Sequence, residues 1–157
     1  MKQFRPMQAP RWAILKSAFA ITVLMMAQSV MAEPVAVVVN KDNGVDLNEA
    51  DARELVSDIF KRDRSSWPNG EDARPVSREG ATQDTLREEI LGMSRSEWDS
   101  HWISKKQRSG ETPPRQVGST RMAVRLVERD PGGVTLLDET EMDRYGSNVR
   151  VLLWVGD

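Results

Sequence analysis

Apolar and polar residues follow one another along the chain in blocks whose spacing distinguishes strands from helices. The run PVAVVVN at 34–40 is almost continuously β-branched, which is typical of a strand buried on both faces of a parallel sheet. A helical pattern begins after Asn48, a residue that is favourable at a helix N-cap. The apolar face of this helix comprises Ala52, Leu55, Val56, Ile59 and Phe60.

The same alternation continues to the end of the chain. Further strands are predicted at 73–77, 134–138 and 148–155. The polar segment before the first of these contains Trp67, which we expect to fold back on the domain.

Three further helices are predicted between these strands. Their inward residues are Leu86, Ile90 and Leu91 in the first, Trp98 and Trp102 in the second, and Met122, Ala123, Leu126 and Val127 in the third. The first ends at Gly92, and the second opens with a capping box from Ser94 to Glu97. The segment 104–119 is expected to be irregular.

Strands that alternate with helices indicate an α/β fold. We expect a mainly parallel sheet with helices on both of its faces. No internal repeat interrupts the pattern, so residues 33–157 are predicted to form a single domain.

The first 32 residues differ in pattern from the rest. Lys2, Arg5, Arg11 and Lys16 precede an apolar core that ends in small residues, which is typical of a secretory signal peptide. The core is shorter than the roughly 20 residues of a membrane span, although an uncleaved anchor is the alternative. We therefore expect cleavage after residue 32, a periplasmic product and no membrane attachment afterwards.

Charge and cysteine content narrow the function classes. Without the four basic residues of the leader, 18 basic residues face 24 acidic ones, a net charge of −6. Such a domain is a poor candidate for binding nucleic acid. The absence of cysteine excludes thiol catalysis, cysteine-ligated metals and disulfides.

The order of the pieces resembles a known family. The stretch VVVNKDNGVDLNEADARELVSDIFKRDRSSWPNGEDARPVSRE, with the later stretches LGMSRSEWDSHW and ERDPGGVTLLD, is similar to periplasmic phosphate-binding proteins of ABC transporters, especially their short members. The resemblance covers about residues 35–155. It implies a fold of the type II periplasmic-binding-protein class and a non-enzymatic transport role.

The chain also departs from this family. A complete binding protein has two lobes that hold ligand between them, whereas this chain has material for a single lobe. The family carries an Arg and then Gly-Ser-Gly-Thr at a helix start, where this chain has REGATQD. The resemblance implies that Arg78, Gly80 and Thr82 belong to an anion site, with Ala81 as the nearest counterpart of the missing Ser.

Two interpretations of residues 78–82 remain open from the residues themselves. The free N–H groups of a helix start, a close backbone approach at Gly80 and the planar fork of Arg78 would suit phosphate or another small oxyanion. Alternatively, Thr82 only caps its helix, and Arg78 pairs with a nearby acid such as Glu79 or Asp84.

Other candidate residues give weaker indications. Lys105, Lys106, Arg108 and Arg115 could extend an anion surface or contact a partner, although a solvated loop is the simpler interpretation. The only histidine, His101, lies between Trp98 and Trp102 and is interpreted as structural. No catalytic, metal-binding or cofactor motif is present, so we expect neither an enzyme nor a cofactor.

Two functions follow as hypotheses. The first is a periplasmic, substrate-binding-like protein that binds phosphate or another oxyanion weakly through one lobe. The alternative is an envelope interaction module that has lost solute binding and that contacts a protein partner or a second copy of itself.

Overall fold

The structure is a computed structural model that describes residues 33–156. The predicted leader, 1–32, and the last residue lie outside the described part, so the signal peptide stays a prediction. The described elements, in chain order, are β1 (Val35–Asn40), α1 (Glu49–Lys61), β2 (Arg74–Arg78), α2 (Ala81–Thr85), the π-helical turn η1 (Leu86–Ile90), α3 (Arg95–Ser109), β3 (Arg115–Val117), α4 (Thr120–Arg129), β4 (Gly133–Asp138), α5 (Glu139–Tyr145), the 3-10 turn η2 (Gly146–Asn148) and β5 (Val149–Val155).

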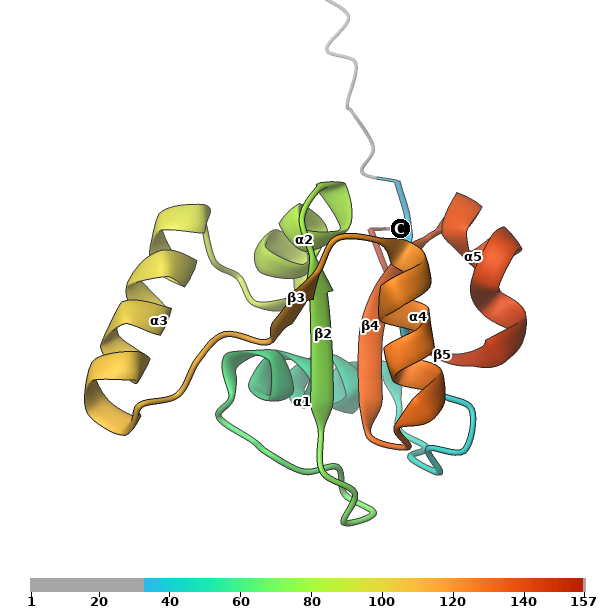
Figure 1. The fold of residues 1–157 in the computed structure, drawn as a ribbon, viewed down its shortest axis with the longest axis horizontal. Coiled ribbons are helices and arrows are strands. Elements are labelled where there is room, and N and C mark those ends of the chain that lie inside the picture. Colours follow the sequence, from blue (N-terminus) through green and yellow to red (C-terminus); the bar gives the residue numbers. More distant parts are fainter. Residues whose placement is uncertain (1–32, 157) are drawn as a thin grey trace, which may run out of the picture. The chain divides into compact units, whose positions relative to one another are not determined.

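The strands form one mixed sheet in the order β3-β2-β4-β1-β5 (Figure 1). Strand β2 is parallel to β3 and to β4, whereas β1 is antiparallel to both β4 and β5. Four of these strands therefore point the same way and β1 points the opposite way, which confirms a mainly parallel sheet. All six residues of β1 are buried, as its apolar run predicts, but the expectation that this run lies among parallel strands was wrong, since β1 is antiparallel to both of its neighbours.

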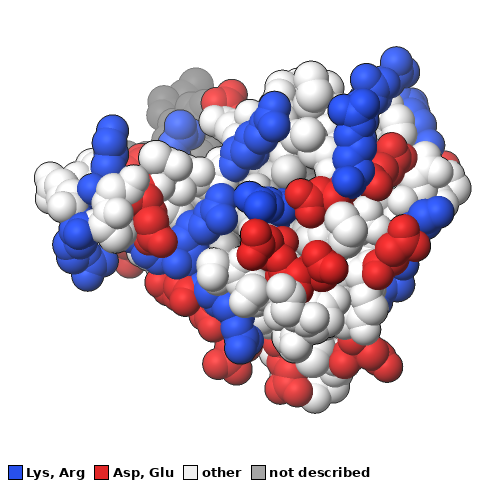
Figure 2. Space-filling model, turned by 60° about the horizontal axis from the view of Figure 1, so that its bottom comes forward, with Lys and Arg blue, Asp and Glu red and all other residues white. Residues whose placement is uncertain are grey.

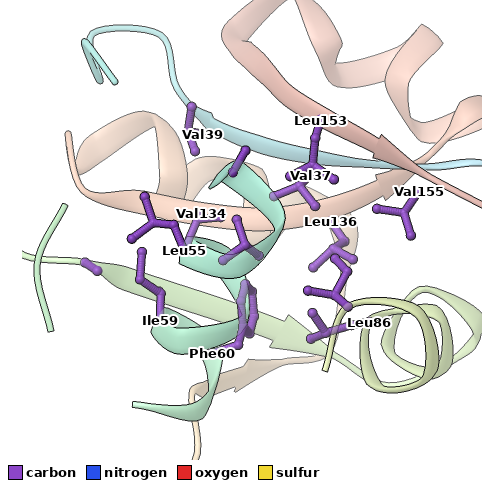
Figure 3. Close-up of a cluster of buried hydrophobic side chains, with 14 of the residues drawn as sticks. Val37, Val39, Leu55, Ile59, Phe60, Leu86, Val134, Leu136, Leu153 and Val155 are labelled. Carbon is purple, nitrogen blue, oxygen red and sulfur yellow. The ribbon is translucent and has the colours of Figure 1, made fainter. Parts of the chain in front are cut away.

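One face of the sheet carries the larger core, which is drawn in Figure 3. Leu55, Ile59 and Phe60 of α1 pack in one cluster with Val37 and Val134 of the sheet. The helical face predicted after Asn48 is therefore buried, and the Asn48 side chain accepts the backbone N–H of Asp51 at 3.0 Å. Leu86 closes the same core from the π-helical turn.

The opposite face is covered by α4 and α5, which confirms helices on both faces. Val124 of α4 packs with Ala36, Val38 and Leu137, and side chains of α5 pack beside them. The predicted inward face of α4 was partly wrong, because Met122 is 48% exposed and Val124 takes the buried position.

Trp67 folds back onto the domain as predicted. It is 2% exposed, and its indole Nε1–H donates to the carbonyl oxygen of Gly132 at 2.9 Å. The backbone of the same loop also approaches Gly132 closely, since a Cβ at Gly132 would lie 1.7 Å from the backbone oxygen of Asp72. The loop before β2 and the turn before β4 are thereby joined.

The segment 104–119 is largely regular, so its prediction as an irregular piece was wrong. Helix α3 continues to Ser109 and ends at Gly110, which adopts φ +73°, and residues 115–117 form the edge strand β3. Basic and polar residues fill the second half of α3, which concealed its helical period. In Figure 1, α3 (yellow) lies to the side of the sheet, beyond β3.

Charge is not segregated on the face of the molecule that Figure 2 draws. On the face drawn in Figure 2, basic and acidic side chains lie intermixed over the molecule. Among the described residues, no helix is both long and apolar enough to cross a membrane.

Candidate functional site

The carboxyl ends of three parallel strands lie side by side at one end of the sheet, near the top of Figure 1. We call this end of the sheet its carboxyl edge. Strand β2 ends at Arg78, β3 ends at Val117, and β4 ends at Asp138. A helix starts shortly after each of them: α2, α4 and α5 respectively. In α/β sheets this edge is where ligands bind, so it is the place to examine the predicted anion site.

Arg78 makes a two-pronged ion pair with Glu141 at this edge. Its two terminal nitrogens donate to the two carboxylate oxygens of Glu141, each at 2.7 Å. The side chains of Arg78 and Glu141 are only 11% and 17% exposed. Parallel donation to a carboxylate is the strongest geometry available to an arginine, and partial burial shields the pair from screening by water.

Further groups complete the surroundings of Arg78. Its guanidinium donates to the hydroxyl oxygen of Thr120 at 2.8 Å and to the backbone carbonyl of Leu136 at 2.9 Å. A longer contact of 3.4 Å reaches the hydroxyl oxygen of Thr82. Arg78 is thus held by groups from α2, α4, β4 and α5.

Glu141 has a second role at the start of α5. Its carboxylate accepts the backbone N–H of Asp138 at 3.1 Å, while the Asp138 side chain accepts the N–H of Glu141 at 2.8 Å. This reciprocal pair is a capping box. The Thr120 hydroxyl also donates to the Glu141 carboxylate.

The pKa of Glu141 is shifted below its ordinary value. Burial alone would raise this pKa, but hydrogen bonds from Arg78, Thr120 and the Asp138 backbone, together with the charge of Arg78, outweigh that effect. The carboxylate therefore stays ionised at neutral pH, and Arg78 is neutralised by it.

The alternative interpretation of residues 78–82 was right that Arg78 pairs with an acid, but it named the wrong partner. Glu79 makes no ion pair among the described residues, and Asp84 instead pairs with Arg87. Glu141 lies 63 positions away along the chain, so only the fold brings it to Arg78.

The predicted site residues lie together, although not all as expected. Gly80, not Thr82, is the N-cap of α2, at φ +109°, where a side chain would strain the backbone. Ala81 is the first residue of α2 and is exposed. Thr82 is buried and directs its hydroxyl towards Arg78, so the prediction that it caps the helix was wrong.

A hollow of about 520 Å³ adjoins the cluster. It is lined by Arg78, Glu79, Gln116, Val117, Gly118, Ser119 and Thr120. Ser119 is the N-cap of α4 and accepts the backbone N–H of Met122 at 3.3 Å. The hollow is therefore bounded by Arg78 and by the start of a ten-residue helix.

Thr120 and Glu141 are the functional candidates that the sequence interpretation missed. A Gly-Ser-Thr run directly before the helical pattern at 120–129 was a usable signal, because small and hydroxylic residues favour helix starts. Asp138 and Glu141 also have the three-residue spacing of a capping box. Neither signal identifies Arg78 as the partner.

The four basic residues at 105–115 do not form one continuous surface. The Lys105 side chain is 11% exposed and donates to the Lys61 carbonyl at 2.5 Å and to Asp63 at 2.7 Å. It joins α3 to the loop after α1 and is not available to extend an anion surface. Arg115 is exposed on β3, and Lys106 and Arg108 are exposed on α3.

The aromatic residues of α3 pack against one another. The rings of Trp98 and Trp102 meet edge to face with centroids 5.3 Å apart, and His101 stacks on Trp98 at 6.2 Å. Trp102 is buried, which confirms its interpretation as a core residue. The His101 Nε2 atom lies 3.2 Å from the Lys61 carbonyl, consistent with a structural role.

Metal-ligating side chains are not clustered in the described part of the chain. Across residues 33–156, no group of three or more His, Asp or Glu side chains is close enough to hold a metal ion. Glu141 of α5 instead contacts Arg78 and the start of its own helix.

Comparison with known proteins gives the fold. Two solved structures are similar: an ABC-type phosphate transport receptor from Vibrio cholerae, with 22% identity over 76% of this chain and 45% of that chain at a TM-score of 0.56, and a possible phosphate binding protein from Planctomyces limnophilus DSM 3776, with 12% identity over 78% and 42% at 0.50. This chain spans less than half the length of either structure. The resemblance predicted from the sequence is thus confirmed at the level of the fold. No family model and no curated protein sequence matches the chain.

Proposed function

We propose that this chain is a non-enzymatic, periplasmic, substrate-binding-like protein that binds phosphate or a similar small oxyanion weakly at the carboxyl edge of its sheet. Its fold is similar to part of a solved phosphate transport receptor, 45% of whose chain it covers. The periplasmic location follows from the predicted leader at 1–32.

The observation that carries the proposal is the set of donors around Arg78. The guanidinium and the Thr120 hydroxyl already grip the two oxygens of a carboxylate. The same donors can bind two oxygens of a phosphate, because arginine forks fit both groups. The adjoining hollow of about 520 Å³ is large enough to admit such an anion.

Affinity should be low for two reasons. The carboxylate of Glu141 competes for the same donors, and the hollow is open on one side, so little of the ligand surface would be buried. We expect a dissociation constant for phosphate of about 1 mM or weaker, which corresponds to a binding free energy of only about 4 kcal/mol.

Calorimetric titration of the purified chain with phosphate tests this proposal. Arg78→Met should abolish binding, whereas Arg74→Met, at the opposite end of β2 with a 58% exposed side chain, should leave it unchanged. Both substitutions remove one positive charge, so general electrostatics is controlled. Circular dichroism checks that each variant is folded. An absence of heat at millimolar phosphate, or equal binding by the two variants, would contradict the proposal.

An envelope interaction module is the second candidate, and one observation favours it. Arg78 is already neutralised by Glu141, so the carboxyl edge presents a polar surface without a free cation from this residue. Such an edge could contact a protein partner or a second copy of the chain. Sedimentation velocity over a range of concentrations tests self-association, and a strict monomer at every concentration counts against that form of it.

A further inference from the structure

The carboxylate of Glu141 is coordinated as a bound anion would be. Each of its oxygens accepts from two donors: one oxygen from Arg78 and Thr120, the other from Arg78 and the backbone N–H of Asp138. These donors come from three separate elements: β2, α4 and the last residue of β4, which is also the N-cap of α5. The chain therefore supplies an oxyanion to its own candidate site.

We propose that Glu141 is a tethered competitor that determines the affinity of this site for external oxyanions. The inference rests on the proposed function and deepens it. An incoming phosphate binds Arg78 only after the Glu141 side chain has left, because a doubly charged ligand and a carboxylate cannot share one guanidinium without strong repulsion. Glu79 lines the hollow and adds to that repulsion while Glu141 is in place.

The local structure allows Glu141 to leave without unfolding its helix. Helix α5 has only seven residues, none of them fully buried, and its start is held from both directions of the capping box. When the Glu141 carboxylate departs, the Asp138 side chain still accepts the Glu141 N–H at 2.8 Å. The N-cap therefore survives, and only the side-chain torsions of Glu141 need to change.

The hollow gives the incoming anion its route. It is bounded by Arg78 and Thr120, two of the groups that hold Glu141. An anion there meets the same guanidinium and hydroxyl from the open side, and it replaces the carboxylate oxygens one for one. Exchange of one anion for another keeps the buried charge of Arg78 compensated at the end of the process.

Phosphate titration of Glu141→Gln tests the competitor directly. The substitution keeps the length of the side chain and removes its charge, so phosphate affinity should rise at least about tenfold if the carboxylate occupies the donors at least nine-tenths of the time. Glu139→Gln is the matched control, since it removes the same charge from the exposed first turn of the same helix. That control should leave the affinity unchanged.

The double variant Arg78→Met with Glu141→Gln tests whether the gain in phosphate affinity depends on Arg78. It should bind no phosphate, because the competitor and the guanidinium are both gone. A Glu141→Gln affinity equal to that of Glu139→Gln would overturn the inference, as would a gain that persists in the double variant.

The outcomes separate this inference from the proposed function. Weak, Arg78-dependent binding by the unaltered chain without any gain in Glu141→Gln overturns the inference and leaves the function standing. Arg78-dependent binding by Glu141→Gln, with none in the unaltered chain, supports the inference and removes the function.

A second measurement on the unaltered chain decides the case if Glu141→Gln fails to fold. The backbone amide of Asp138 loses its contact with the Glu141 carboxylate when phosphate displaces that carboxylate. Its nuclear magnetic resonance signal should shift on addition of high phosphate and should not shift with sodium chloride at equal ionic strength. An Asp138 amide that stays fixed while phosphate binds would overturn the inference.

Discussion

Two buried cations hold this molecule together in different ways. Arg78, in the body of the domain, and Lys105, on α3, each have side chains that are only 11% exposed. The side chain of Glu141, the partner of Arg78, is only 17% exposed. The side chain of Asp63, the partner of Lys105, is 50% exposed. We therefore expect the two pairs to differ in strength, although their cations are equally buried.

The exposure of the acid decides what happens when the cation is removed. Without Arg78, the carboxylate of Glu141 would remain within the protein with its charge uncompensated, which is costly. Without Lys105, the carboxylate of Asp63 would simply be hydrated. The Arg78 pair therefore belongs to the organisation of the candidate site, and the Lys105 pair attaches one helix to a loop.

The largest effect should come from Arg78→Met. We expect it to lower the free energy of unfolding by about 3–5 kcal/mol, since it leaves a buried acid unpaired. Urea denaturation measures the change. Adding Glu141→Leu to this variant should restore much of the loss, because neither charge then remains buried. A double variant as unstable as the single one would show that the pair is not the cause.

Two tryptophans extend the comparison between the body and α3. Trp67 donates its indole N–H to the Gly132 carbonyl, whereas among the described residues the buried indole N–H of Trp102 has no hydrogen-bond partner. The Gly132 carbonyl also accepts the backbone N–H of Arg74 at 2.9 Å, so Trp67→Phe removes one of its two donors. Trp67→Phe should therefore destabilise the protein by about 0.5–1.5 kcal/mol more than Trp102→Phe, the net contribution of one hydrogen bond. Thermal or urea unfolding of both variants checks this, and equal losses would refute the distinction.

Lys105→Met should lower the free energy of unfolding by less than Arg78→Met does. The variant removes hydrogen bonds to the Lys61 carbonyl and to Asp63, with a cost of about 1–2 kcal/mol after allowance for the exposure of Asp63. Lys106→Met, at the exposed neighbouring position on α3, is the matched control and should have almost no effect. If Lys105→Met cost as much as Arg78→Met, the contrast between the two pairs would not hold.

The smallest expected effect is the pH dependence of the free energy of unfolding. The pKa of Glu141 is lowered because the hydrogen bonds and charge of Arg78 and the other donors outweigh burial, which by itself raises it. The folded protein therefore binds this proton less tightly than the unfolded chain. The associated stability is present above the ordinary value of 4.5 and is lost as the pH falls below it.

The pKa of Asp63 is lowered in the same sense. Burial raises it, but the hydrogen bond and charge of Lys105 outweigh that effect, from an ordinary value of 3.8. Urea midpoints measured from pH 7 down to pH 3 should fall most steeply below about pH 4.5. Arg78→Met should flatten the Glu141 part of this decline, and Lys105→Met only the Asp63 part. An unchanged profile in Arg78→Met would contradict the assignment.

Much of the fold was predictable from local patterns. The apolar face from Ala52 to Phe60 and the β-branched run at 35–40 each repeat one period over several residues, so their buried positions could be inferred without knowledge of their neighbours. Strand β3 was missed because three residues are too few to display alternation, and the end of α3 was missed because it is polar on most sides.

The candidate site was likewise predictable only in part. Local sequence was enough to predict that Arg78 follows a strand and precedes a glycine-led helix start, since those are features of adjacent residues. The pairing of Arg78 with Glu141, the contacts of Thr120 with both and the inward position of Lys105 became evident only in the folded chain. These are contacts between segments 21 to 63 residues apart, and the chain has many acids that could have been the partner. Which acid is chosen depends on where parallel strands end together, and that is a property of the assembled sheet.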